Sequence, residues 1–438
     1  MHNPRKIFLG LLIICLTIPL HLRAQFFTHP MSSEALRPFW DLNGFNSAIF
    51  SLNNNTLLST DISSSQTNPA FLSNIRSPKA CLSVRYLNND QKSILGTNYP
   101  EVQSNSSILH ADYFGFAYPV PVYQGSLVFA LSYTPSAYYN SALKSKGDFT
   151  ITDLGEVYEE ISIKESGSLN TLRLAGAVEF LPNFNLGAAL NFHGGNRHYQ
   201  SVKTENEDRL DTATEDFPNI QYFESIKPEY SGINLDLGFS FQSANLKFGC
   251  RLSTPLKLTI HELSEFRHIY NYDDGSGSDT TEYYDFEYNS RYPLEIAPSF
   301  GVKLGNFTLG LDFIIHNWRN IKVGLLNDAS EVNRDLNWNL RRTTDIGLSV
   351  AVPLAKTIST RFAYRLIPSP YDDIQNTDEE YHHLLGGSIE TIIKNSLIVG
   401  CSYQRSFGNQ TIPHAYFGTY STQSYTNDLL SLSLAIVL

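Results

Sequence analysis

The chain has 438 residues, of which 43 are acidic and 32 are basic, so its formal net charge is -11 at pH 7. A chain this acidic is not expected to bind nucleic acid, because nucleic-acid-binding proteins present basic surfaces. Hydrophobic residues make up 42% of the composition, which is too few for a bundle of membrane-spanning helices. The aromatic content of 13% is compatible with the aromatic girdles of a membrane β-barrel.

Residues 1–24 are predicted to be a secretory signal peptide. Arg5 and Lys6 form a basic start, an apolar stretch follows over residues 7–20, and Ala24 supplies a small residue before the cleavage site. The apolar stretch is too short to span a membrane comfortably, and no later segment has a long apolar run. The exported chain is therefore expected to be soluble or to insert as a closed β-barrel, the only other structure that satisfies every backbone group in lipid.

Residues 25–79 show little alternation and many turn-forming residues, such as the run Asn53-Asn54-Asn55. We predict that this segment is an N-terminal hatch, which either plugs a barrel or hangs in the periplasm. Residues 80–438 differ, because apolar and polar residues alternate there as they do in strands with one apolar face. The segment from Phe307 to Ile315 is typical, with five apolar side chains on one face. This pattern predicts a transmembrane antiparallel β-barrel over residues 80–438.

About fourteen strands are predicted, many of them about ten residues long, as a tilted strand needs to cross a bilayer. Their ranges are 80–88, 110–119, 124–136, 168–180, 184–200, 230–242, 245–261, 292–304, 306–318, 337–352, 357–367, 380–393, 396–407 and 428–438. The gaps between them alternate between long and short. A barrel with both termini in the periplasm has short periplasmic turns and long outer loops, so loop lengths alternate along the chain. A soluble β-sandwich has no physical reason for such an alternation of loop lengths.

The final strand ends inside the alternating pattern, with Leu430, Leu432 and Leu434 on one face and Ser431 and Ser433 on the other. Pairing of this strand with the first one, around Leu82 and Val84, is expected to close the barrel without a free edge.

Parity along the strands predicts that charged and polar side chains of both signs point into the lumen. A charge that faced lipid at mid-depth would cost about 2–4 kcal/mol for Arg or Lys. These side chains are expected either to form a structural network or to line a polar path. The inward set includes Arg85, Arg173, Glu179, Asn191, His193, Asp236, Lys247, Arg251, Glu295, Lys303, Asp312, Asp345, Arg361, Arg365 and Glu390.

A long predicted outer loop, residues 262–291, combines acids with aromatic side chains that are candidates for contact with an apolar ligand or for packing within the loop. These candidates are Phe266, Tyr270, Tyr272, Tyr283, Tyr284, Phe286 and Tyr288. No spacing selects a catalytic Ser–His pair or a set of metal ligands. We therefore predict no catalytic residue, no metal and no cofactor, and we do not expect an enzyme.

Several segments resemble the FadL-type family of outer-membrane transporters for long-chain fatty acids and other hydrophobic compounds. Asn68, Pro69 and Ala70 are similar to the motif that ends the hatch of that family. The expected count of fourteen strands also agrees with the family. Further similar segments are Tyr292-Pro293-Leu294, Gly301-Val302-Lys303-Leu304, the strand 307–313 followed by Trp318, Tyr364-Arg365 with Pro368-Ser369-Pro370, and Gly386-Gly387-Ser388. The resemblance implies a hatch in the lumen, an apolar ligand near the outer loops and a lateral opening in the wall.

The expected function is passive uptake of hydrophobic small molecules, such as long-chain fatty acids, across the outer membrane of a Gram-negative bacterium. The expected partners are outer-membrane lipids and the hydrophobic ligand. A second hypothesis, motivated by the acidic loops, is an accessory barrel that docks or scaffolds exported proteins in a secretion system. A third is an open porin for polar solutes.

Overall fold

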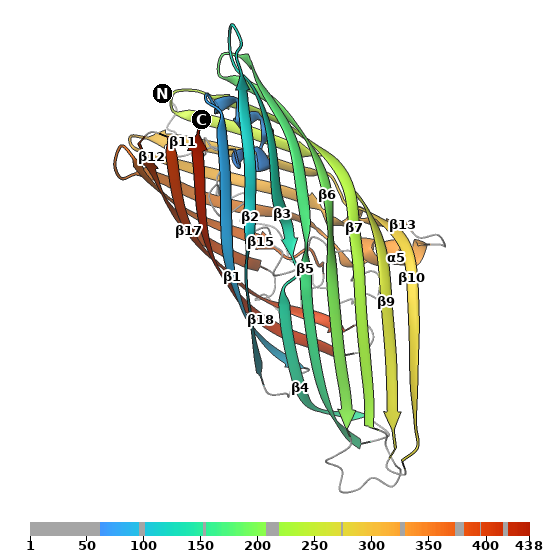
Figure 1. The fold of residues 1–438 in the computed structure, drawn as a ribbon. Coiled ribbons are helices and arrows are strands. Elements are labelled where there is room, and N and C mark those ends of the chain that lie inside the picture. Colours follow the sequence, from blue (N-terminus) through green and yellow to red (C-terminus); the bar gives the residue numbers. More distant parts are fainter. Residues whose placement is uncertain are drawn as a thin grey trace, which may run out of the picture.

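The computed structural model describes residues 62–95, 101–151, 155–206, 219–272, 275–324, 329–372, 381–394, 396–414 and 419–438. Over these residues the chain forms one antiparallel sheet that closes on itself as a barrel (Figure 1). The first strand, β1 (Lys79–Leu95), pairs with the last, β18 (Thr419–Val437), from Lys79 opposite Val437 to Leu95 opposite Ser421. This pairing leaves no open edge along the seam between the two ends of the barrel chain, as the sequence predicted.

The sheet contains eighteen strand segments. We call each strand position around the barrel wall a stave. Four staves are each made of two segments in line, so the barrel has fourteen staves. The two-segment staves are β3 (Leu127–Tyr138) with β4 (Ser141–Ile151), β8 (Leu246–Ser253) with β9 (Lys257–Asn271), β11 (Glu295–Leu304) with β10 (Gly277–Arg291), and β12 (Phe307–Asn317) with β13 (Lys322–Gly324). The continuous staves are β1, β2 (Val102–Val120), β5 (Gly155–Leu181), β6 (Phe184–Asn206), β7 (Asn219–Gln242), β14 (Arg342–Pro353), β15 (Ile358–Pro368), β16 (Tyr381–Ile393), β17 (Leu397–His414) and β18.

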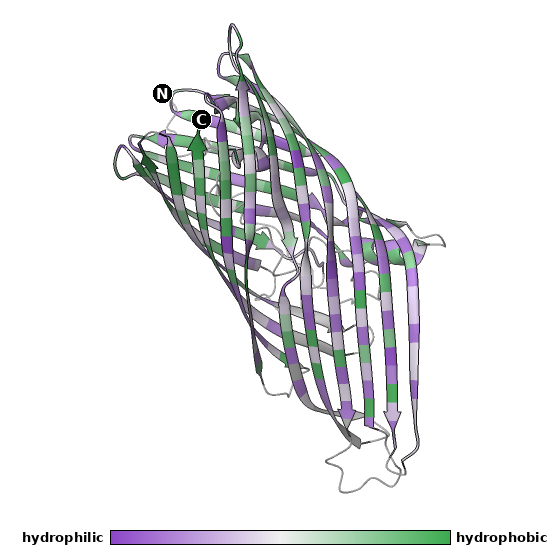
Figure 2. Cartoon of the chain, in the orientation of Figure 1, coloured by the Kyte–Doolittle hydropathy of each residue, from purple (hydrophilic) through white to green (hydrophobic). Residues whose placement is uncertain are grey.

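The outer surface of the wall carries an apolar belt. On β18, Leu430, Leu432 and Leu434 are 42–53% exposed, whereas Ser431 between them is fully buried on the lumen side. Figure 2 shows hydrophobic residues concentrated toward the barrel end that holds both termini, while β10 at the opposite end is mostly hydrophilic. Such a belt is the lipid-facing surface of a transmembrane β-barrel. Within the described ranges, no helix has the length and apolar character needed to cross a membrane.

The short turns lie where the sequence predicts them, at the end of the barrel that carries the termini. For example, β5 ends at Leu181 and β6 begins at Phe184. The opposite strand ends were predicted wrongly, because much of what was expected to be long loops is strand. The predicted loop 262–291 is the hairpin of β9 and β10, and β7 begins at Asn219 inside the predicted loop 201–229.

These extensions build a sheet that continues beyond the apolar belt. We call it the outer sheet: β4, β9 and β10, together with the parts of β5, β6 and β7 that pair with them. It stands on one side of the barrel mouth (Figure 1). Its strands are long, with 27 residues in β5 and 24 in β7 against 10 in β11.

Two short helices precede β1 and lie inside the barrel. They are α4 (Ser64–Thr67) and η1 (Pro69–Asn74), and η1 packs against β3, β5, β6 and β7. Ile62, Leu72 and Ile75 are buried in a cluster with small inward residues of the wall, among them Ala177 and Ala189. The signal peptide and residues 25–61 of the predicted hatch lie outside the described residues, so the hatch as a whole stays a prediction.

Substitution Leu432→Arg is expected to lower the free energy of unfolding by about 2–4 kcal/mol, because it places a guanidinium against lipid near mid-depth. Urea unfolding of the protein in lipid vesicles measures this change. Leu432→Met keeps an apolar side chain and serves as the control. An Arg variant as stable as the Met variant would contradict the orientation of β18.

Candidate functional site

A cavity of about 220 Å³ lies in the lumen at the level where the two-segment staves break. Its lining includes Pro135 near the end of β3, Thr254 and Leu256 between β8 and β9, Pro293 between β10 and β11, and Trp318 after β12. Two of the breaks contain a proline, Pro255 and Pro293, which has no backbone N–H to give to a β-ladder. The sequence therefore interrupts neighbouring staves at one height, and the interruption leaves room inside.

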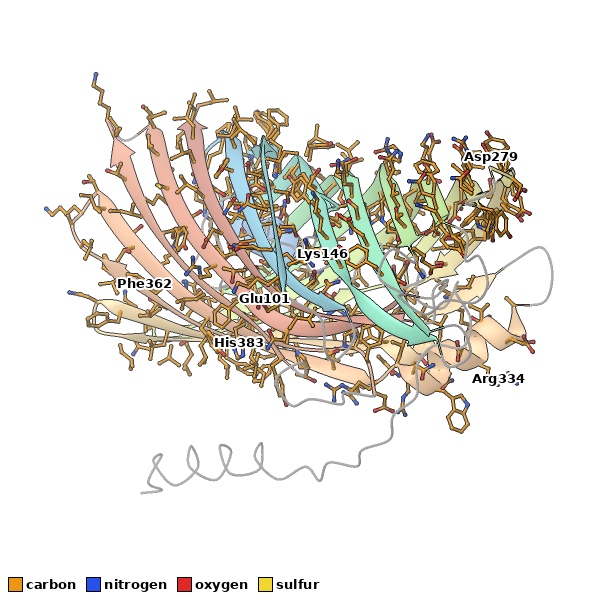
Figure 3. All side chains as sticks on the ribbon, turned by 90° about the horizontal axis from the view of Figure 1, so that it is seen from below. Glu101, Lys146, Asp279, Arg334, Phe362 and His383 are labelled. Atoms are coloured by element: carbon orange, nitrogen blue, oxygen red, sulfur yellow. The ribbon has the colours of Figure 1, made fainter. Side chains whose placement is uncertain are left out.

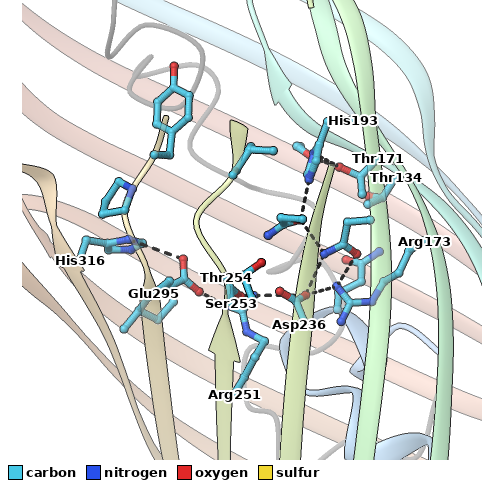
Figure 4. A pocket seen from close by; sticks show the side chains of 18 of the residues that line it. Thr134, Thr171, Arg173, His193, Asp236, Arg251, Ser253, Thr254, Glu295 and His316 are labelled. Atoms are coloured by element: carbon cyan, nitrogen blue, oxygen red, sulfur yellow. Dashed lines mark hydrogen bonds and ion pairs between the residues drawn. The ribbon is translucent and has the colours of Figure 1, made fainter. Parts of the chain in front are cut away.

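A chain of charged and polar side chains crosses the cavity from β5 to β12 (Figure 4). At its centre, the Asp236 carboxylate accepts a hydrogen bond of 2.7 Å from the Arg173 guanidinium and one of 3.1 Å from the Asn191 amide. Arg251 lies 3.8 Å from the same carboxylate and donates to Glu295, which in turn lies 3.6 Å from the imidazole of His316.

A second branch of the network surrounds His193. Its imidazole bonds the Thr171 hydroxyl through Nδ1 at 2.9 Å and the Asn234 side-chain oxygen through Nε2 at 3.0 Å. Arg365 and Asp345 line the cavity from the opposite wall. Side-chain alternation along the strands thus correctly predicted that these side chains point inward. The structure pairs Arg173 with Asp236 and Arg251 with Glu295. Paired charges hold the strands in register. The same cavity also has apolar lining, from Leu256, Ile314 and Trp318.

On the outer side of the cavity lies an apolar cluster of buried residues. Its centre is α5 (Ser330–Asn339) and η2 (Trp318–Asn320), which lie between β12 and β14 in the chain and pack against residues of β9, β10 and the wall segment β13. Val332 and Leu336 of α5 pack with Tyr288, Tyr292 and Trp318 and are almost fully buried. The Asn333 side chain donates to and accepts from the backbone of Val323, both at 2.8 Å. The sequence had predicted an outer loop over 319–336 and gave no sign of this inward packing.

On the inner side, the predicted hatch motif contacts the wall through glycines. The Asn68 side chain donates to the backbone carbonyls of Phe239 and Cys250, at 3.0 and 3.2 Å, and accepts from the Ala70 amide at 3.0 Å. A Cβ at Gly187 would lie 2.4 Å from the Ala70 nitrogen, and one at Gly238 would lie 2.0 Å from the Asn68 oxygen. The motif can therefore approach β6 and β7 only because both strands carry glycine there.

The seven predicted ligand-contact aromatics differ in burial along the β9–β10 hairpin. They lie on β9 and β10, or just after β9 at Tyr272. Of the six on the strands, five share one face of the hairpin, and Tyr283 points to the other face. Tyr288 is buried in the apolar cluster and Phe286 packs against it, whereas Tyr283 is 74% exposed. The rings of Phe266 and Tyr284 contact each other, with centroids 5.7 Å apart. Whether any of them contacts a ligand remains a prediction.

No cluster of His, Cys, Asp or Glu side chains in the described part of the chain is arranged to hold a metal ion.

Three site features were missed from the sequence: the aligned breaks, the inward helix α5, and Trp318, whose indole donates to the Thr343 hydroxyl at 2.8 Å. The prolines at the breaks were visible as a signal, because Pro255 and Pro293 follow alternating segments.

Substitution Gly187→Ala is expected to displace the hatch motif or to strain β6, and to lower the free energy of unfolding by about 1–3 kcal/mol, as overpacking does. Denaturant unfolding in detergent measures the loss. Gly194→Ala in the same strand is the matched control, because its Cβ would have its nearest neighbour at 3.8 Å. Equal stability of the two variants would show that Ala70 does not press against β6.

Comparison with known proteins identifies one family model, described as BamG, which matches residues 52–362. No curated protein matches the chain. Among solved structures, a FadL homologue from Pseudomonas aeruginosa is 12% identical, with 88% of this chain and 96% of that chain covered and a TM-score of 0.57. The toluene transporter TodX of Pseudomonas putida is 10% identical, with 91% and 100% covered and a TM-score of 0.58.

The toluene transporter TbuX of Ralstonia pickettii is 11% identical, with 85% of this chain and 93% of that chain covered and a TM-score of 0.51. At such identities the likeness concerns the fold. The FadL-type resemblance of the sequence is therefore supported at the level of structure, while the matching family model is a different one.

Proposed function

The chain belongs to the BamG family, and we propose that it works in the outer membrane of a Gram-negative bacterium as an accessory barrel that docks exported proteins, as in a secretion system. The single observation that carries this proposal is the occupied lumen. Side chains narrow its described part at successive levels, at the hatch motif, at the paired charges beside the cavity of about 220 Å³ and at the apolar cluster around α5. An occupied lumen supports neither an open porin nor a wide passage.

The outer sheet offers what docking requires, a large and well-braced surface above the membrane. About ten residues are enough for a tilted strand to cross a bilayer, so more than half of β5 and β7 extends beyond that need. Buried ion pairs stiffen the sheet: Arg197 lies 2.6 Å from Glu165, and Lys203 lies 2.8 Å from Glu159.

When the protein is solubilised from its native membrane, we expect a protein partner to co-purify in stoichiometric amount. Replacing residues 265–283 by a short turn shortens the β9–β10 hairpin at a paired position, because Ser264 lies opposite Tyr284. This variant should lose the partner and still show the heat-dependent gel shift of a folded barrel.

Replacement of residues 409–424 of the β17–β18 hairpin by the same short turn is the control, because Gly408 lies opposite Tyr425. The control should keep the partner, because it leaves the outer sheet intact. Purification of the unmodified chain with lipid alone and no protein would contradict the docking function.

Uptake of hydrophobic small molecules is the second candidate, and one feature of the wall favours it. Pairing between β2 and β3 stops at Phe114 opposite Tyr133. The register of β3 against β5 then shifts between Pro135 and Ala137, which leaves Ser136 without a partner position. Thr134, Pro135 and Ser136 also line the cavity, so this seam is where a ligand could leave sideways into lipid.

Deletion of Ser136 should restore regular pairing of β3 with β5, since Pro135 faces Asn170 and Ala137 faces Leu169. If the seam carries ligand, uptake of long-chain fatty acids and of toluene into proteoliposomes should fall to the level of empty vesicles. Substitution Ser136→Ala keeps the extra residue and is the control. Uptake by the original chain equal to that of empty vesicles would remove this candidate.

A further inference from the structure

The outer sheet ends in an unpaired edge at β10. One side of β10 pairs with β9 along its whole length, from Gly277 opposite Asn271 to Arg291 opposite Lys257. The other side pairs with β13 only at Asn289–Arg291. Within the described residues, the edge over 277–288 therefore has no neighbouring strand, and Figure 1 shows no ribbon beyond β10 on that side.

The backbone groups that face this open edge can be identified from the ladder. Tyr272 donates to the Ser276 carbonyl at one end of the hairpin, and Tyr292 donates to the Leu256 carbonyl at the other. In an antiparallel pair, bonded and non-bonded positions alternate. The even-numbered residues of β10 therefore bond to β9, and the odd-numbered residues point their N–H and C=O groups outward. The outward residues are Asp279, Thr281, Tyr283, Asp285 and Glu287.

The edge is accessible, and the strand has none of the usual steric protection. All nine residues from Gly277 to Asp285 are exposed. In Figure 3, Asp279 lies at the far end of the outer sheet, well away from Phe362 on the barrel wall. Soluble sheets usually protect such an edge with a proline, a bulge, a covering loop or charged side chains, because an unpaired strand is a template for another strand. The described part of β10 contains no proline and no bulge.

Charge then limits which strand can add to this edge. β10 carries four acidic residues and one basic residue. Asp279 is paired with Arg267 at 2.5 Å, and this contact holds the pKa of its carboxyl below the ordinary value. Glu282 and Glu287 have no basic partner among the described residues. A second copy of the chain would place the same acids opposite each other, which destabilises a pairing.

We propose that the open edge of β10 binds an extended, basic segment of a partner protein by β-strand addition. The backbone of the partner bonds to the odd-numbered residues of β10, and its Lys or Arg side chains lie beside Glu282 and Glu287. Strand addition uses main-chain bonds for affinity and alternate side chains for specificity. This inference rests on the proposed docking function and names the partner segment that the outer sheet recognises.

The direct test uses a fluorescent peptide of about ten residues, the length of an ordinary strand, in which pairs of lysines alternate with pairs of threonines. Lysines then lie on both faces of the added strand, because Glu282 and Glu287 point to opposite faces of β10. The purified full chain in detergent should bind it, and binding should weaken as salt is raised, because the charges are exposed. The double variant Thr281→Pro with Tyr283→Pro removes two outward N–H donors and leaves the bonds to β9 in place. It should bind about tenfold more weakly, as the loss of two hydrogen bonds implies.

The double variant Thr281→Val with Tyr283→Val keeps both donors and is the matched control, expected to bind as the original chain does. Glu282→Gln with Glu287→Gln should weaken the lysine peptide several-fold. It should not weaken a glutamate–threonine peptide, which we expect to bind poorly to every variant. Equal binding of the lysine peptide to the proline and valine variants overturns strand addition at β10, and so does a dimer of the original chain that the prolines abolish.

Co-purification from membranes separates the two proposals. Loss of the native partner from the proline variant and its retention by the valine variant supports the β10 edge. A partner that stays with both variants overturns the edge and leaves docking intact. Absence of any protein partner from the original chain refutes docking, while the peptide measurement still decides whether β10 accepts a strand.

Discussion

The structure depends on one constraint: backbone N–H and C=O groups that lie in lipid must all be paired within the protein. The ladder between β1 and β18 meets this constraint by joining the first stave to the last. Once the wall is closed, alternation decides the rest, since each strand must present apolar side chains to lipid and the others to the lumen. The paired charges around Asp236 are a consequence of this alternation. At the depth of the apolar belt, Arg173 and Arg251 can pair with a carboxylate only on the lumen side, where the free-energy cost of the charge is lower than in lipid.

The same constraint explains which parts of the fold could be predicted. In the belt, lipid on one side and lumen on the other enforce alternation, and the predicted strand starts and turns near Leu181 and Phe184 agree with the structure. Beyond the belt, water reaches both faces of a strand, so the sequence no longer alternates although the ladder continues. The segment 262–291 therefore looked like a loop, while it is the hairpin of β9 and β10.

Only those features of the site that follow from the alternation of side chains along a single strand could be predicted. Side-chain direction follows from the register of one strand, and this placed Asp236, Arg251 and Glu295 in the lumen correctly. The height of the breaks and the inward packing of Leu336 on α5 depend on contacts between distant segments, which no single-strand pattern contains. For the same reason, the sequence did not show that Tyr288 is buried in the apolar cluster while Tyr284, on the same face of the hairpin, is exposed.

The aligned breaks also have a mechanical consequence. The flanking staves β3–β4, β8–β9 and β10–β11 are interrupted at the height of the cavity, whereas β5, β6 and β7 run through it without a gap. A force applied to the end of the outer sheet is therefore transmitted to the membrane-spanning part through the three continuous strands β5, β6 and β7, which lie on one side of the barrel. The outer sheet is attached to one side of the barrel. A sideways force on it is therefore expected to tilt the whole barrel in the membrane before it separates strands of the wall.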